Sequence, residues 1–198
     1  MITDFFIGIF ISTLITSLFT TRLYVLIFWY SMNSFALGFL AIVIGRDLDD
    51  KALLISGIIT IVLKAIGIPY YLKHLSAKNK FVRRIPPKVR IHYAIILIPA
   101  ILVFTFYLAE PLSQMIDSHA NYVAISISSL FLSLLLMMEH DNIAPKIIGF
   151  LAVENSLFLL ATSATGGMPM IVELGIFFDL LMAIVIINLL FRKEEFKI

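Results

Sequence analysis

Seven continuous apolar stretches, each long enough to cross a lipid bilayer, dominate this chain. About 20 helical residues span the ~30 Å hydrocarbon layer of a membrane. We place the spans at Phe5–Phe19, Leu23–Ile44, Ala52–Leu75, Ile91–Leu108, Tyr122–Met138, Ala144–Ser163 and Met168–Phe191. Hydrophobic residues make up 61% of the 198 residues, more than a soluble domain of this size can bury. The sequence therefore predicts a polytopic membrane protein.

The apolar runs favour helices over strands, because they do not alternate with a period of two residues. The predicted fold class is all-α, with about seven transmembrane helices in one membrane domain, residues 1–198. A weak internal repeat is also visible, since Met32-Asn33-Ser34 and Glu154-Asn155-Ser156 each precede an apolar run. We interpret residues 1–75 and 122–198 as two three-helix units of the same orientation, joined by the helix near 91–108.

The charges between spans predict the orientation in the membrane. The connection after the third span is rich in basic residues: Lys73, Lys78, Lys80, Arg83, Arg84, Lys88 and Arg90. Such connections remain in the cytoplasm, so we expect an outside N-terminus and a cytoplasmic C-terminus. The same segment could instead dock anionic lipid or an acidic partner. Its position in a short loop at a membrane face does not favour nucleic acid as a partner.

Four ionisable residues lie within the apolar spans: Lys64, Glu154, Glu173 and Asp179. A charge near the bilayer centre costs ~2.5–3.5 kcal/mol on insertion scales, so four cost on the order of 10 kcal/mol. Packing a hydrophobic bundle does not require them. They point to the movement of protons or small cations.

Lys64 precedes a proline, Pro69, in the middle of the third span. Proline cannot donate to the carbonyl four residues back, so we expect a kink near Ala65 and a carbonyl open to water beside the ammonium group. Two interpretations of Lys64 are open. It can be a protonatable switch, or it can pair statically with a carboxylate.

The three acidic residues differ in their surroundings. The neighbours that share a helical face with Glu154 are all apolar, so its partner must come from another helix or subunit. Glu173 lies about one turn inside the seventh span, where the helix dipole favours an anion and a structural role is the alternative. Asp179 lies deeper, among Phe and Leu, and suggests proton traffic or a buried cation.

The sequence gives no sign of a catalytic centre. The absence of cysteine excludes thiolate metal sites and iron–sulfur clusters, and the four histidines fall near span ends or in loops. There is no glycine-rich phosphate loop. We therefore expect no catalytic residue, no cofactor and no metal site in this chain.

Several of these motifs together resemble the hydrogenase-4 component E family. They are Val153-Glu154-Asn155, Met170-Ile-Val-Glu173-Leu-Gly175-Ile, Asp179 with Arg192, and Val62-Leu-Lys64 followed by Ile68-Pro69. That family belongs to the membrane arms of formate hydrogenlyase and related group 4 hydrogenases. The last three spans are similar to the K subunit of respiratory complex I and the C subunit of multi-subunit cation/proton antiporters. In that comparison Asp179 matches a relay glutamate, whereas Glu154 lies one turn after the expected position, Leu151.

The resemblance implies a subunit of a proton- or sodium-translocating redox complex in a bacterial or archaeal cytoplasmic membrane. Its partners would be antiporter-like and complex I-like membrane subunits and a hydrogenase module, which carries the redox chemistry. Lys64, Glu154, Glu173 and Asp179 would form part of a lateral proton relay. Two alternatives are a cation/proton antiporter, as a subunit or by itself, and a structural spacer between antiporter-like subunits.

Overall fold

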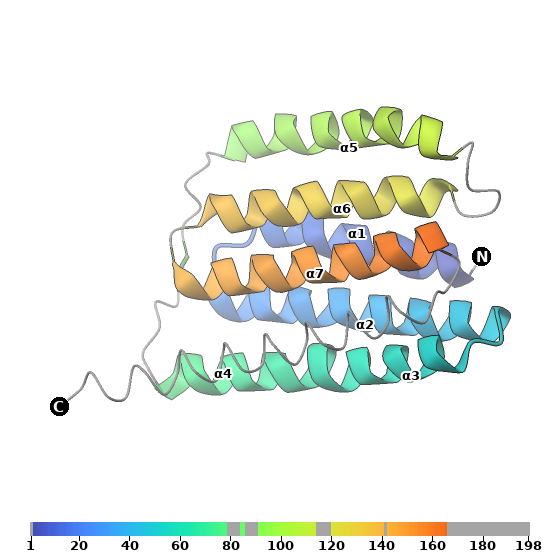
Figure 1. Ribbon diagram of the computed structural model, residues 1–198. Helices are drawn as coiled ribbons and strands as arrows, with labels where there is room; N and C mark the ends of the chain where they lie inside the picture. The colour runs from blue at the N-terminus through green and yellow to red at the C-terminus, as the bar shows by residue number, and fades with distance from the viewer. Residues whose placement is uncertain (1, 79–83, 86–90, 114–119, 141, 166–198) are drawn as a thin grey trace.

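The protein folds as a bundle of long apolar helices (Figure 1). The computed structural model describes residues 2–78, 84–85, 91–113, 120–140 and 142–165. Its helices are α1 (Ile2–Leu18), α2 (Leu23–Asp47), α3 (Lys51–Ile59), the π-helix η1 (Thr60–Gly67), α4 (Ile68–Lys78), α5 (Ile91–Ser113), α6 (Ala120–Glu139) and α7 (Ile143–Thr165). Within the described residues the only extended pairing is an isolated bridge between Arg22 and Arg84. The all-α prediction is confirmed.

The helices coincide with the first six predicted spans. Five are long and apolar enough to cross a membrane, and α1 is a shorter apolar helix of 17 residues. The third of these spans is built from α3, η1 and α4, which follow one another without a break. The protein is therefore a multi-pass membrane protein. The seventh predicted span, Met168–Phe191, lies outside the described residues.

The helices pack so that α2 and α6 each contact several neighbours. Helix α2 contacts α1, α3, η1, α4 and α7, and α6 contacts α1, α5 and α7. Figure 1 shows that α1 and α6 run in one direction while α2 and α7 run in the opposite one. A parallel repeat requires this arrangement, although the repeat itself stays a prediction.

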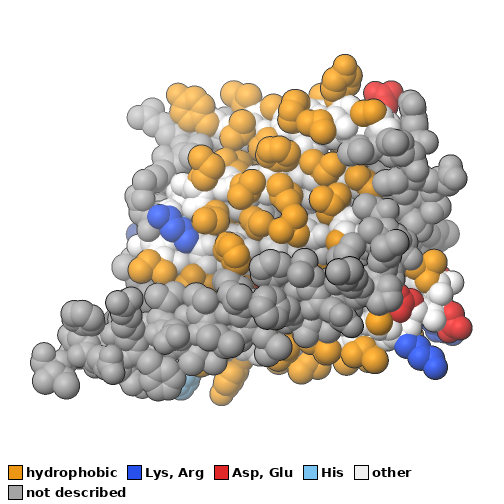
Figure 2. All heavy atoms as spheres, in the orientation of Figure 1, with side chains coloured by type: hydrophobic (Ala, Val, Ile, Leu, Met, Phe, Trp, Pro, Cys, Tyr) orange, Lys and Arg blue, Asp and Glu red, His pale blue; other side chains and the backbone are white. Residues whose placement is uncertain are grey.

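Apolar side chains also cover the outside of the bundle. Figure 2 shows them spread over the visible face, as expected of a surface in contact with lipid chains. Among the five long apolar helices α5 is the most exposed, because only 22% of the apolar stretch within Tyr93–Pro111 is buried inside the protein. A space-filling core nevertheless forms between the helices, around Phe10, Leu37 and Leu132.

The turn between α2 and α3 is acidic, with Asp47, Asp49 and Asp50. Asp50 caps α3, because its Oδ1 accepts hydrogen bonds from the backbone N–H groups of Ala52 at 2.9 Å and Leu53 at 3.3 Å. Asp49 adopts a positive φ of 53°, which aspartate tolerates better than most residues. The turn returns the chain antiparallel to α2 and sets the close approach of the two helices.

Two facing glycines bring α2 and the third span into contact. A Cβ atom added to Gly57 would lie 2.7 Å from the carbonyl oxygen of Gly38, and one added to Gly38 would lie 2.9 Å from that of Gly57. The atoms that an added Cβ would meet belong to the backbone, so they could move away only if the two helices moved apart. Small residues of this kind let membrane helices approach closely and pack through their backbones.

We predict that Gly57→Ala lowers the stability of the folded protein by about 1–3 kcal/mol, because the added methyl group must separate the two helices. Gly8→Ala is the matched control, since a Cβ at this exposed helical position meets no atom within 4 Å. Thermal unfolding of both variants in lipid nanodiscs measures the effect. Equal melting temperatures for the two variants would contradict the close approach.

Candidate functional site: a buried ion pair held by asparagines

Lys64 lies in the middle of the membrane span, inside the π-helical segment η1. Its side chain is 2% exposed, so it does not extend to the membrane surface. Roughly 15 Å of helix separates it from the nearer end of its span, Lys51–His74.

The backbone around Lys64 departs from an α-helix for a reason visible in the sequence. Pro69 has no N–H to donate to the carbonyl of Ala65, and the segment before it widens into a π-helix rather than simply bending. We expected that carbonyl to be open to water. Instead it accepts a hydrogen bond from the Ser31 hydroxyl of α2. A neighbouring helix thus satisfies the backbone group that proline leaves without a donor.

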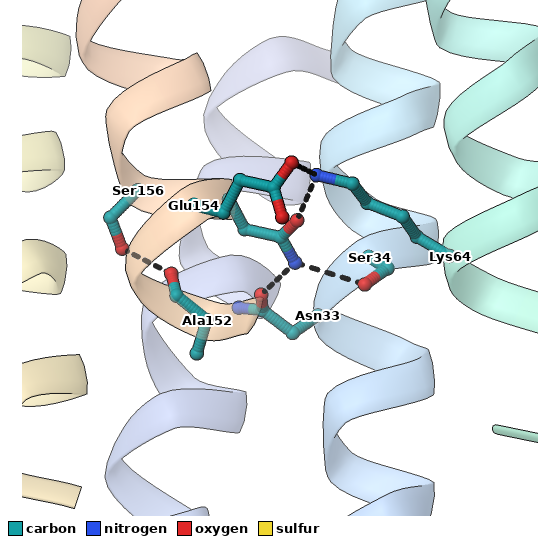
Figure 3. A network of polar contacts seen from close by, with 7 residues as sticks. Asn33, Ser34, Lys64, Ala152, Glu154 and Ser156 are labelled. Atoms are coloured by element: carbon teal, nitrogen blue, oxygen red, sulfur yellow. Dashed lines mark hydrogen bonds and ion pairs between the residues drawn. The ribbon is translucent and has the colours of Figure 1, made fainter. Parts of the chain in front are cut away.

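Glu154 lies at the corresponding depth of α7, and its apolar helical neighbours cannot neutralise it. Its partner comes from another helix, as predicted. The Lys64 Nζ atom is 3.1 Å from Glu154 Oε1, with the two side chains 2% and 9% exposed. Figure 3 shows the two side chains extending toward each other from separate helices. The structure therefore joins two of the four predicted relay residues.

Asn155 holds the ammonium group from a second side. Its Oδ1 accepts a hydrogen bond from Lys64 Nζ at 3.2 Å. Glu154 and Asn155 are consecutive and do not share a helical face, but the long lysine side chain reaches both. A buried charge is tolerated when it is paired and also hydrogen-bonded, and Lys64 meets both conditions.

The amide nitrogen of Asn155 extends the network into α2 and α1. Its Nδ2 donates to Asn33 Oδ1 at 2.9 Å and to Ser34 Oγ at 2.9 Å (Figure 3). Asn33 Nδ2 in turn donates to the backbone carbonyl of Phe10 at 2.9 Å and to Thr13 Oγ1 at 3.2 Å. Asn33, Ser34 and Asn155 are each no more than 1% exposed. The network therefore links the ion pair of η1 and α7 to two further helices, α2 and α1.

A separate pair of hydroxyls joins α7 to α6 next to this network. Ser156 Oγ lies 3.3 Å from Ser133 Oγ and donates to the carbonyl of Ala152 at 2.9 Å. Ser133 also donates to the carbonyl of Ser129. These hydroxyls satisfy themselves within their own helices, so they tolerate burial without a charged partner.

Sequence reasoning identified the two charged members of the site but not their amide partners. Asn33, Ser34 and Asn155 were noted only as a repeated motif, and that motif was the available signal for them. The structure brings the two asparagines of the motif into direct contact. Glu173 and Asp179 lie outside the described residues, and their place in a relay stays a prediction.

The site consists of two oppositely charged side chains held by neutral amides. No group of three or more His, Cys, Asp or Glu side chains that could hold a metal ion occurs in the part of the chain that the structure describes. A lysine and a glutamate at 3.1 Å can exchange one proton between them, from ammonium and carboxylate to amine and acid. The neutral asparagine amides position the pair without titrating.

Comparisons with known proteins reveal one distant similarity. No protein-family model matches the chain, and no solved structure matches it. The chain is 26% identical over 147 residues to "Uncharacterized protein Rv0085" of Mycobacterium tuberculosis. The aligned region is 73% of this chain and 66% of that protein, so the chain spans just under two thirds of its relative's length. The relative's name states no activity.

We predict that Ser31→Ala destabilises the protein by about 1–2 kcal/mol, because the Ala65 carbonyl loses its donor inside the membrane. Pro69→Ala in the Ser31→Ala background should recover much of this loss by supplying a backbone N–H. Unfolding in nanodiscs compares the two single variants with the double variant. Strictly additive effects of the two substitutions would contradict the proposed exchange of donors.

We also predict that Asn155→Leu costs about 2 kcal/mol or more, because it removes a bond to an ammonium group and leaves the Asn33 carbonyl oxygen without its donor. Ser163→Ala is the control in the same helix. Ser163 is equally buried, but its hydroxyl bonds only to the Leu159 carbonyl one turn earlier. A similar loss of stability in both variants would show that the Asn155 network contributes no more than an ordinary hydrogen bond within a helix.

Proposed function

We propose that this protein is a membrane subunit of a redox-driven ion pump of the group 4 hydrogenase or formate hydrogenlyase type, related to complex I. In this role it carries no redox chemistry of its own. Its buried ionisable groups change protonation as a neighbouring subunit turns over. Antiporter-like and complex I-like membrane subunits and a hydrogenase module are its proposed partners.

The observation that carries the proposal is the Lys64–Glu154 pair in the middle of the bundle. Taking two charges out of water is expensive, and replacing such a pair by apolar residues is often neutral or stabilising. Such a pair adds little net stability even where it fixes how helices pack, so it is also a candidate for function. Ionisable groups at this depth mark proton relays and ion pathways in membrane proteins.

The arrangement around the pair suits a switch that is coupled to a neighbour. Asn155 holds the ammonium group at 3.2 Å, so Lys64 keeps a hydrogen-bond partner when Glu154 takes up a proton. Asparagine amides do not carry protons onward, so the path must leave the pair through other titratable groups. Glu173 and Asp179 are the proposed next members on the seventh span.

The proposal also includes the orientation of the bundle and the membrane in which it lies. The bridge between Arg22 and Arg84 puts the start of α2 and this member of the basic connection at the same end of the bundle. The positive-inside rule makes that end cytoplasmic, with the N-terminus outside. The proposed location is the cytoplasmic membrane of a bacterium or archaeon.

A structural spacer is the second candidate, and the same pair supports it. A close ion pair joined to α2 and α1 through amides would also make the subunit a rigid spacer between antiporter-like neighbours. The third candidate, a cation/proton antiporter, differs because it would move ions without a redox partner. The three candidates predict different effects of neutral substitutions.

We predict that Lys64→Met, Glu154→Gln, Glu173→Gln and Asp179→Asn each abolish most of the proton pumping per electron transferred. The measurement is proton movement against electron transfer in membrane vesicles that contain the assembled complex. Glu110→Gln, which alters an exposed carboxylate of α5, is the matched control and should pump normally.

Normal coupling in all four variants would refute the relay. Reduced assembly with normal coupling in the complexes that do assemble would support the spacer. Cation/proton exchange by the purified chain alone in liposomes would support the antiporter.

A further inference from the structure

A second buried group of titratable side chains lies far from the ion pair, where α6 ends. Glu139 is the last residue of α6 and His140 follows it. Polar residues at the end of a membrane helix commonly extend into the water of the headgroup region. Here Glu139 is 2% exposed and His140 is 1% exposed. Their burial is not explained by their position in the sequence.

The bonding of His140 defines which of its nitrogens is available. Nδ1 lies 3.3 Å from the carbonyl oxygen of Leu136, and a carbonyl can only accept, so Nδ1 carries the hydrogen. In the neutral ring Nε2 is then a bare acceptor. Nε2 is buried and has no hydrogen-bond partner among the described residues. Burial lowers the pKa of His140, against a smaller opposite effect of the Leu136 bond, so the ring is neutral near pH 7.

Glu139 presents a second acceptor without a donor. Its Oε2 atom is buried and lacks a hydrogen-bond partner in the described part of the chain. An ionised carboxylate in this condition is costly, whereas a carboxylic acid supplies its own O–H. Two adjacent residues thus place two buried proton acceptors at one end of the bundle.

The charged groups on the elements around this end do not neutralise the site directly. Helices α1, α5 and α7 pack against α6, and Ile85 packs in the same core cluster as Leu136. Arg22, Lys73, Arg84 and Lys146 are charged side chains that the structure describes at this end, and all four are exposed, as is the titratable His74 of α4. They make this end of the bundle basic, and within the described residues none of them donates a hydrogen bond to Glu139 Oε2 or His140 Nε2.

The site is also separate from the Lys64–Glu154 pair. Ser133 is the α6 residue that contacts the hydroxyl beside Asn155, and six residues, or roughly 9 Å of helix, separate it from Glu139. The buried Leu136 lies between Ser133 and Glu139 on α6. The two groups of ionisable side chains are therefore separate sites in the bundle.

We propose that Glu139 and His140 form a proton-storing site at the basic end of the bundle. The carboxyl group of Glu139 holds one proton near neutral pH, and Nε2 of His140 accepts a second proton when the site opens to water. Each step is the gain or loss of one proton, without a further reactant. This site goes beyond the relay proposed above and would stand if the chain served an antiporter.

Infrared difference spectroscopy of the full chain in lipid nanodiscs tests the carboxyl group. At neutral pH the spectrum should contain a carboxylic-acid C=O band that Glu139→Gln removes and Glu110→Gln leaves in place. A folded Glu139→Gln variant with an unchanged band would overturn the proposal, because Glu139 would then be ionised. A spectrum that responds to sodium at constant pH would also overturn it, in favour of a metal-cation site.

The imidazole is tested in a chain that retains Glu139, so the result does not depend on the folding of that variant. Nitrogen-15 spectra of labelled histidines, assigned with His140→Gln and His74→Gln, should show His140 as the neutral tautomer protonated at Nδ1. It should protonate only at a pH below the ordinary range of a histidine side chain. Titration of His140 in that ordinary range would contradict a buried acceptor. None of these results depends on coupling to electron transfer.

Discussion

The arrangement of this bundle depends on one buried ammonium group at mid-membrane. Lys64 cannot remain there by Coulomb attraction to Glu154 alone, because the desolvation of both charges offsets much of that attraction. Asn155 supplies the additional hydrogen bond and is itself held by Asn33 and Ser34. The charge therefore fixes how η1, α2 and α7 lie relative to one another. A lipid environment alone provides little preference for one such arrangement over another.

The irregular backbone of the third span also helps to place Lys64 against its partners. Pro69 leaves the Ala65 carbonyl without its helical donor, one residue from the lysine. The hydroxyl of Ser31 replaces that donor from α2, and the π-helical turns change the direction in which Lys64 leaves its helix. Facing glycines farther along the same two helices allow the approach that these contacts need. Backbone geometry and buried charge thus determine the α2 interface together.

The two buried titratable sites differ in how their charges and hydrogen-bond acceptors are compensated. The central pair combines opposite charges and neutral amides, so it can change protonation without leaving a bare ion in hydrocarbon. The site at the end of α6 contains two acceptors and no described donor, so it depends on protons taken from outside. In the roles we propose, the site at the end of α6 would store protons near the membrane surface, and the central pair would exchange them in the membrane interior.

The sequence by itself determined the helices, because a bilayer of fixed thickness demands apolar runs of fixed length. The described helices follow the first six predicted spans closely, and Glu154 was correctly expected to find its partner on another helix. Only the tertiary structure decided which partner it found, since that depends on how each helix is rotated about its axis. For the same reason Asn155 and Asn33 were visible as a motif but not as a contact, and Glu139 resembled an ordinary helix end. Burial of a polar group is a property of its neighbours in space, which a run of apolar letters does not specify.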